Sequence, residues 1–225
     1  MKKKQTAAFF DFDGTIYDGV IALDFVKFAF KNNIIKFSEF LSLSKFLYYY
    51  LFDKFNLAER YYINSKLYQL TKGWNSKELE DAAEKFFSNK GHKKIYSNML
   101  SIIKWHKKNN HKIVIVTSAL KEIVKPAKKY LEVDDILATE VGIKKGIYTG
   151  IIKELPIGHN RIAIVRKYCT KHNLDLSKSY AYSDHFSDIP MLGGVGNAVA
   201  TEPDRKLRKY ATQKGWKIIN CIVPI

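Results

Sequence analysis

Three short apolar runs, far apart in the chain, each end in side chains that can bind a ligand. Residues 7–10 are followed by Asp11, residues 114–116 by Thr117 and Ser118, and residues 180–182 by Ser183 and Asp184. Buried parallel strands read as such continuous apolar runs, and their carboxyl ends meet at one edge of the sheet, where ligands bind. The pattern therefore predicts that these side chains gather at one edge.

Further apolar runs at 136–138, 198–200 and 217–219 alternate with helical patterns at 162–172 and 203–213. Such alternation is typical of an α/β protein with a doubly wound parallel sheet, a Rossmann-like core. Residues 146–150 contain two glycines and predict a small hairpin.

Residues 21–108 show a different periodicity, with apolar side chains three or four positions apart and no convincing strand. Examples are Leu23, Val26 and Phe30, and later Leu79, Ala82 and Phe86. We therefore expect a core formed by residues 1–17 and 95–225, into which residues 18–94 are inserted as an all-helical cap.

The net charge of +16 over 225 residues attracts phosphates in nucleic acid, anionic lipid or small substrates. We favour a solvated lysine-rich surface, and because no nucleic-acid-binding motif is present we expect no nucleic-acid partner.

Cys169 and Cys221 are too few for a disulfide framework, which favours a cytoplasmic protein. The longest apolar stretch, 34–52, contains Lys36, Glu39 and Lys45, so we expect no transmembrane helix. The sequence does not give an oligomeric state.

The sharpest motif is the run of seven residues from Phe9 to Thr15, FFDFDGT. Asp11 and Asp13 lie two residues apart, which puts both carboxylates on the same side of an extended chain, and Gly14 lets the backbone turn close to a ligand. Two acidic residues at this spacing are a weak signal by themselves, because acidic pairs in turns usually cap helices. Its position directly after an apolar strand makes it stronger.

Taken together, these motifs resemble the haloacid dehalogenase superfamily, in its phosphoserine-phosphatase-like branch with a helical cap. Asp11 and Asp13 match the first motif, Thr117 the hydroxyl of the second, and Asp184 with Asp188 the acidic fourth. Several motifs in the right order are far more specific than one. The resemblance implies a Mg²⁺-dependent phosphatase in which Asp11 attacks phosphorus and forms an aspartyl-phosphate, while Asp13 acts as general acid and base.

The resemblance also implies a ligand set. Mg²⁺ would be held by the Asp11 carboxylate, the Asp13 backbone carbonyl and Asp184, and the hydroxyls of Thr117 and Ser118 would bind phosphate oxygens. Where the family's third motif has a lysine, this chain has Arg161, so either Arg161 serves as the phosphate-binding cation or a nearby lysine reaches in. Asp188 would anchor that cation or a metal-bound water, although a helix cap ahead of Pro190 is nearly as good an interpretation.

The substrate is predicted to be a small phosphorylated molecule other than phosphoserine. Relatives specific for phosphoserine carry a glutamate shortly after the first motif, where this chain has Val20, and no arginine stands convincingly at the second cap position. The aromatic and aliphatic residues at 37–52 are either the cap's own core or a face that meets a lipid surface or a lipid phosphate. Alternatives are a phosphotransferase, a lipid-phosphate phosphatase, and a basic binding protein without catalysis.

Overall fold

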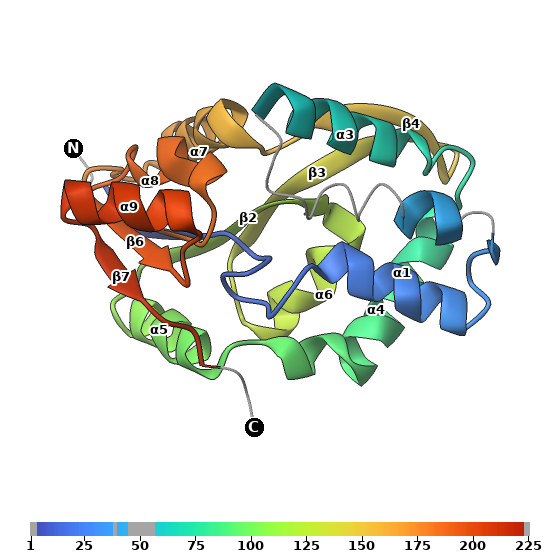
Figure 1. Cartoon of the computed structure of the whole chain (residues 1–225), viewed down its shortest axis with the longest axis horizontal. Coiled ribbons are helices and arrows are strands. Elements are labelled where there is room, and N and C mark those ends of the chain that lie inside the picture. The colour runs from blue at the N-terminus through green and yellow to red at the C-terminus, as the bar shows by residue number, and fades with distance from the viewer. Residues whose placement is uncertain (1–3, 38–39, 45–56, 223–225) are drawn as a thin grey trace.

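The computed structural model describes residues 4–37, 40–44 and 57–222. Its elements follow the order β1 (Ala7–Phe10), α1 (Ile21–Lys31), α3 (Leu57–Gln69), α4 (Ser76–Asn89), η1 (Gly91–Lys94), α5 (Ser97–Lys108), β2 (Lys112–Leu120), α6 (Lys121–Tyr130), β3 (Asp135–Lys144), β4 (Ile147–Glu154), α7 (Gly158–His172), β5 (Tyr180–Ser183), η2 (Phe186–Asp188), α8 (Ile189–Leu192), β6 (Asn197–Thr201), α9 (Arg205–Lys214) and β7 (Lys217–Ile219) (Figure 1).

Across the described residues, seven strands form one sheet in the order β4-β3-β2-β1-β5-β6-β7. Every neighbouring pair is parallel except β3 and β4, which form an antiparallel hairpin. The chain winds outward from β1 in both directions, so the topological switch lies at β1. The prediction of a doubly wound parallel sheet is confirmed.

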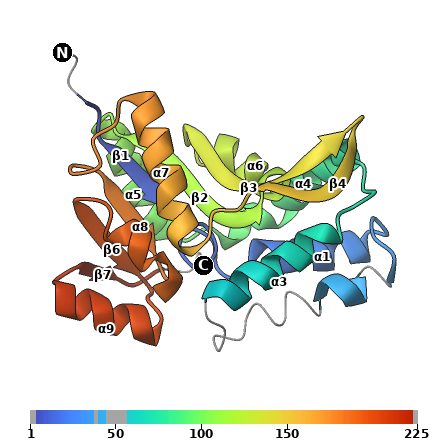
Figure 2. The same ribbon diagram turned by 90° about the horizontal axis from the view of Figure 1, so that it is seen from above.

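Two apolar clusters cover the two faces of the sheet, because successive side chains of a strand point to opposite sides. Ala7 and Phe9 join the cluster under α7, α8 and α9. Ala8 and Phe10 join the other, which contains α5, α6 and the helices of the 21–94 region. In Figures 1 and 2, α1, α3 and α4 lie at the end of the molecule away from β6, β7 and α9.

The two chain segments that connect this helical region to the sheet are bound to each other. The backbone N–H of Asp18 donates to the carbonyl of Lys94 over 2.7 Å, and the Tyr96 hydroxyl donates to Asp18 Oδ1 over 3.1 Å. The Lys94 ammonium lies 2.7 Å from Asp24 Oδ2, which also accepts from the Tyr17 hydroxyl. The two connections are thereby held together beside the carboxyl end of β1.

Three strands run further than their apolar cores indicate. The second strand was predicted to end at Val116, whereas β2 continues to Leu120, with an irregularity between Val116 and Leu120 in its pairing with β3. Ala119 and Leu120 are buried, which explains the extension. β3 and β4 are likewise long because they pair with each other, and their turn places Lys145 and Gly146 at positive φ, as two-residue hairpins require.

Residues 38–39 and 45–52 of the apolar stretch predicted at 34–52 lie outside the described residues. Within the described part, Leu43 is buried while Phe37 and Leu41 are exposed. Among the helices of the described ranges, none has the length and apolar character needed to cross a membrane.

Candidate active site

The register of the sheet brings the predicted site residues to one edge. Phe10, the last residue of β1, pairs with Ile115 on one side and Tyr182 on the other. Asp11 is the next residue, and its backbone N–H donates to the Tyr182 carbonyl over 2.9 Å. Thr117 and Asp184 each follow their paired residue by two positions. The three strands therefore deliver Asp11, Thr117 and Asp184 to the same carboxyl edge.

Arg161, at the start of α7, lies between two of the predicted carboxylates. Its Nη1 is 2.9 Å from Asp11 Oδ1 and 2.5 Å from Asp188 Oδ2, and Asp188 Oδ2 also accepts from the Ser183 hydroxyl over 2.6 Å. Arg161 is 4 % exposed and Asp188 1 % exposed. The buried ion pair places a fixed positive charge against Asp11. The Asp188 side chain makes no cap hydrogen bond at the start of α8, so it pairs with Arg161 and does not cap that helix.

Asp13 is held by the first turn of α1. Its Oδ1 accepts from the backbone N–H of Ile21 over 2.8 Å. This N–H has no partner within the helix, because the first N–H groups of any helix lack one. Val20, the residue before α1, offers no side-chain cap. The Asp13 carboxylate thus caps the first turn of α1, for which Val20 offers no side-chain cap.

Gly14 makes room for Asp184. It adopts φ +72°, which favours glycine, and a Cβ built there would clash with the Asp184 carboxylate. Asp184 Oδ1 in turn accepts from the Thr15 hydroxyl over 3.2 Å. The sequence predicted that the backbone at Gly14 comes close to a ligand, and in the structure the group that lies against Gly14 is the Asp184 carboxylate.

Thr117 and Ser118 form the third side of the site. Thr117 is buried, and its Oγ1 accepts from the N–H of Ala119 over 3.1 Å, which fixes the orientation of the hydroxyl at the strand end. The Ser118 carbonyl accepts from the hydroxyls of Tyr68 and Thr139. Tyr68 belongs to α3, so this bond joins the helical region to the end of β2.

Burial makes the charged forms of these carboxylates costly. It raises the pKa of Asp11 to about 6, with the Arg161 charge opposing the rise and the Asp188 charge adding to it. Burial likewise raises the pKa of Asp13 to about 7, although the Ile21 N–H stabilises its charged form. The pKa of Asp184 lies well above its ordinary value, first through burial and then through the charges of Asp11 and Asp188.

This excess of buried negative charge fits a hard cation. Two unit charges about 4 Å apart repel by roughly 4 kcal/mol at an effective dielectric of 20, and oxygen ligands are those that Mg²⁺ prefers. Asp188 Oδ1 is buried and accepts no hydrogen bond from the described residues. No cluster of three or more His, Cys, Asp or Glu side chains suited to a metal occurs in the described ranges. The predicted set, two carboxylates with one backbone carbonyl, does not require such a cluster.

Some residues of the site escaped the sequence analysis. Ser183 was expected at the edge, but its bond to Asp188, like that of Thr15 to Asp184, depends on the turn geometry. Asp204 caps α9 by accepting from Leu207 N–H and also accepts from Phe186 N–H over 2.6 Å, which fixes the loop after Asp184. The contact of Tyr68 with Ser118 has no signal in the local sequence at all.

Comparison with known proteins finds relatives that match nearly the whole chain. The chain is 29% identical over 222 residues to the "inhibition of morphological differentiation protein" of Streptomyces azureus, covering 98% of this chain and 80% of that protein. It is 27% identical to a protein of Mycobacterium tuberculosis named a probable phosphatase, covering 99% of this chain and 78% of that one.

Among solved structures, a phosphoserine phosphatase captured as a phospho-aspartyl intermediate analogue superposes with a TM-score of 0.67 at 18% identity, over 97% of this chain and 94% of that one. At that identity the likeness concerns the fold. The haloacid dehalogenase-like hydrolase profile matches residues 8–193, which contain all the predicted site residues. The chain belongs to the haloacid dehalogenase-like hydrolase family.

Proposed function

We propose that this protein is a Mg²⁺-dependent phosphatase that hydrolyses phosphate monoesters through an aspartyl-phosphate on Asp11. The observation that supports it most is the placement of Asp11 at the end of β1, against the buried Arg161 guanidinium and two residues from Asp13. Further support comes from the M. tuberculosis relative named a probable phosphatase, and from the phospho-aspartyl analogue captured in a phosphatase of similar fold. Residues 18–94 are proposed as the cap and residues 1–17 and 95–225 as the catalytic core.

In the first step, an Asp11 carboxylate oxygen forms a bond to phosphorus while the bond from phosphorus to the ester oxygen breaks. Asp13, as the carboxylic acid, gives its proton to the departing oxygen, so an alcohol leaves. A pKa near 7 suits this residue, because a general acid works best when its pKa is close to the working pH.

In the second step, Asp13 is a carboxylate and takes a proton from water as the water oxygen bonds to phosphorus. The bond between phosphorus and Asp11 breaks, inorganic phosphate leaves, and Asp13 is again an acid. The Ile21 N–H holds Asp13 in place through both steps, since it binds an oxygen that is not needed for the proton.

The other residues orient and balance charge. Arg161 would offset the charge of the phosphoryl oxygens, and Thr117 and Ser118 would donate to them. Mg²⁺, held by Asp11, the Asp13 carbonyl and Asp184, would supply charge neutralisation at the phosphoryl group. Asp188 positions Arg161 through the 2.5 Å ion pair.

Phosphoserine is proposed to be a poor substrate. Val20 directly precedes Ile21, the residue that binds Asp13, so an apolar side chain stands near the position where an ammonium group would need a partner. An unpaired charge buried there would cost about 1–3 kcal/mol or more.

The test is to trap the intermediate. The protein is mixed with p-nitrophenyl phosphate and Mg²⁺, quenched in acid, digested and measured by mass spectrometry. A phosphoryl adduct on the peptide containing Asp11, absent from Asp11→Asn, supports the proposal. Turnover with an adduct elsewhere would contradict it. Release of nitrophenol and phosphate is compared with and without glycerol; a shortfall of phosphate would reveal transfer to the alcohol.

A further inference from the structure

Strand β2 contains a bulge at the hydroxyls that were predicted to bind phosphate. In its pairing with β3, Val116 lies opposite Leu137, and Leu120 lies opposite Thr139. The three residues 117–119 of β2 therefore face the single residue 138 of β3. A bulge of this kind interrupts the regular ladder of backbone hydrogen bonds and is frequent next to active sites. Other bonds are needed to fix the backbone of this segment.

The Ser118 carbonyl, inside the bulge, accepts hydrogen bonds from two side-chain hydroxyls. One belongs to Thr139 of β3, whose Oγ1 lies 2.7 Å away. The other belongs to Tyr68 of α3, 50 positions earlier in the chain. A carbonyl oxygen has two lone pairs, so it can accept from both donors. The peptide unit that joins Ser118 to Ala119 is thus bound by the neighbouring strand and by the helical region.

The N–H of the same peptide unit binds Thr117. This N–H belongs to Ala119 and donates to Thr117 Oγ1 over 3.1 Å. A hydroxyl that accepts one bond keeps its own hydrogen for another acceptor, and in the proposed mechanism that acceptor is a phosphoryl oxygen. The bonds form a continuous chain, which runs from the Tyr68 hydroxyl through this peptide unit to the Thr117 hydroxyl. Hydrogen bonds in such a chain polarise and strengthen one another.

Tyr68 is itself held on several sides. The residue is 5 % exposed and belongs to the larger apolar cluster. Its carbonyl accepts from Thr71 Oγ1 over 2.7 Å. The segment that follows α3 is bound to β4, because the Gly73 N–H donates to the Tyr148 carbonyl and the Tyr148 N–H donates to the Trp74 carbonyl, both over 2.9 Å. The Tyr68 hydroxyl therefore has a fixed position from which to hold Ser118.

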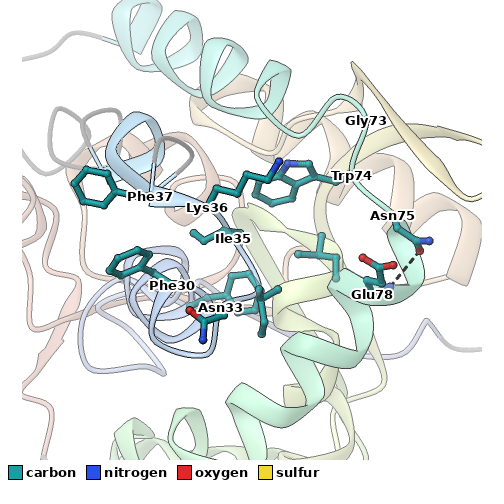
Figure 3. Close-up of a pocket in the computed structure, with 12 residues that line it drawn as sticks. Phe30, Asn33, Ile35, Lys36, Phe37, Gly73, Trp74, Asn75 and Glu78 are labelled. Atoms are coloured by element: carbon teal, nitrogen blue, oxygen red, sulfur yellow. Dashed lines mark hydrogen bonds between the residues drawn. The ribbon is translucent and has the colours of Figure 1, made fainter.

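A large pocket borders the same segment. Figure 3 shows Gly73 and Trp74 at this pocket, with the Lys36 side chain extending toward the Trp74 ring. The pocket holds about 860 Å³, and the described residues that line it include neither Tyr68 nor any of the predicted site residues. The contact of the Tyr68 hydroxyl with Ser118 is therefore separate from this pocket.

We propose that Tyr68 is a positioning residue for phosphate binding, which acts through the peptide unit between Ser118 and Ala119 on the hydroxyl of Thr117. The inference rests on the proposed phosphatase function for the placement of phosphate at Thr117. Tyr68 does this without touching the substrate. The helical region thereby contributes to binding the phosphate group itself, whichever alcohol the ester carries.

The first measurement is phosphate binding without turnover. Inorganic phosphate is titrated into the Mg²⁺-loaded protein by calorimetry. Tyr68→Phe keeps the buried ring and removes only the hydroxyl, so the dissociation constant should rise about three- to tenfold, as for the loss of one neutral hydrogen bond. Tyr61→Phe makes the same change at an exposed position of α3 and should alter the constant by less than about twofold. An unchanged constant in Tyr68→Phe, or an equal rise in Tyr61→Phe, would overturn the proposal.

A double-mutant cycle then asks whether Tyr68 acts through Thr117. Thr117→Val removes the hydroxyl at the end of the chain of bonds, and Thr117→Ser keeps it. Tyr68→Phe should raise the dissociation constant in the Thr117→Ser background and should add less than about twofold in the Thr117→Val background. The same rise in both backgrounds would show that Tyr68 acts elsewhere and would contradict the proposal. Should Tyr68→Phe fail to fold, Tyr68→Met removes the hydroxyl with a more adaptable side chain and enters the same cycle.

Hydrolysis of p-nitrophenyl phosphate separates this inference from the proposed function. A fall in kcat/KM that follows the same cycle supports both. Phosphate binding that follows the cycle, without hydrolysis of any phosphate ester, would sink the phosphatase and keep the positioning role. Hydrolysis with the same kcat/KM in Tyr68→Phe as in the unmodified protein would keep the phosphatase and sink the positioning role.

Discussion

The catalytic edge of the sheet and the apolar wall of the helical region differ in how their side chains are fixed. At the edge, Asp11, Arg161 and Asp188 are positioned by strand ends and by ion pairs of 2.9 and 2.5 Å. In the wall, the Phe86 ring packs on those of Phe25 and Phe28, with ring centroids 5.8 and 5.5 Å apart. The difference teaches that the two regions are held by different forces, ion pairs at the edge and apolar packing in the wall.

The largest expected effect comes from Asp11→Asn. The amide is nearly isosteric but is no nucleophile and is a weaker metal ligand, so turnover should fall by several orders of magnitude. Steady-state assays with p-nitrophenyl phosphate measure this, and the thermal midpoint checks that the fold is kept. Near-normal turnover, with contamination excluded, would show that the reaction does not take place at this edge of the sheet.

Removal of the metal should have a nearly comparable effect. EDTA is expected to silence the enzyme and added Mg²⁺ to restore it, because Asp11 and Asp184 need a cation to approach a phosphate dianion together. Activity is followed through a cycle of chelation, dialysis and readdition. Full activity in chelator would contradict the metal assignment.

Substitution of Arg161 should lower activity by an intermediate amount. Arg161→Ala should lower kcat by about 10²–10³, as loss of one charge-stabilising donor does, while Arg161→Lys should lose far less because a cation remains beside Asp11. The two variants are compared at equal folded fraction, since Ala also leaves two buried carboxylates unpaired. Equal losses would show that the planar guanidinium geometry matters more than its charge.

Substitutions in the wall should lower the stability of the protein and leave the proposed chemistry unchanged. Phe86 is 1 % exposed and packs on Phe25 and Phe28, so Phe86→Ala should lower the free energy of unfolding by about 3–5 kcal/mol. Phe86→Leu keeps most of the volume and should cost less than about 1.5 kcal/mol. Urea denaturation measures both. Loss of the acid-trapped phosphoryl adduct in the folded fraction of either variant would break the separation between the regions.

The smallest expected effect is a pH dependence of stability that comes from His106. Burial lowers the pKa of His106 from 6.5 to about 3, helped by the charge of His111, and its Nε2 lies 2.8 Å from the Tyr182 hydroxyl. The unfolded chain therefore binds a proton that the folded chain excludes, so stability falls as pH drops from about 6.5 toward 3. His106→Gln should flatten this slope in urea titrations, whereas exposed His159→Gln should not. Identical slopes would refute the assignment.

The sheet was predictable because its signals are local. Apolar runs such as 7–10 and 180–182 end at the polar residues that face the edge, and the order of the motifs is the order of the strands. The predicted end of β2 was wrong by four residues, since Ala119 and Leu120 are strand residues only because β3 lies beside them.

The wall was not predictable in the same way. The contact of Tyr68 with Ser118 joins residues 50 positions apart, and it depends on how α3 and the end of β2 meet. Helical periodicity identified apolar positions such as Val26 and Phe86, but periodicity does not say whether an apolar side chain packs on a neighbour or borders an empty space.

The hydrogen bond from Ile21 to Asp13 makes the orientation of the proposed proton donor depend on a helix of the 21–94 region. Ile21 is the first residue of α1, so a substitution that displaces the start of α1 would break this bond and free the Asp13 carboxyl to rotate. The packing of that helix is therefore as much a part of the geometry of the proposed acid as the segment after β1 that carries Asp13.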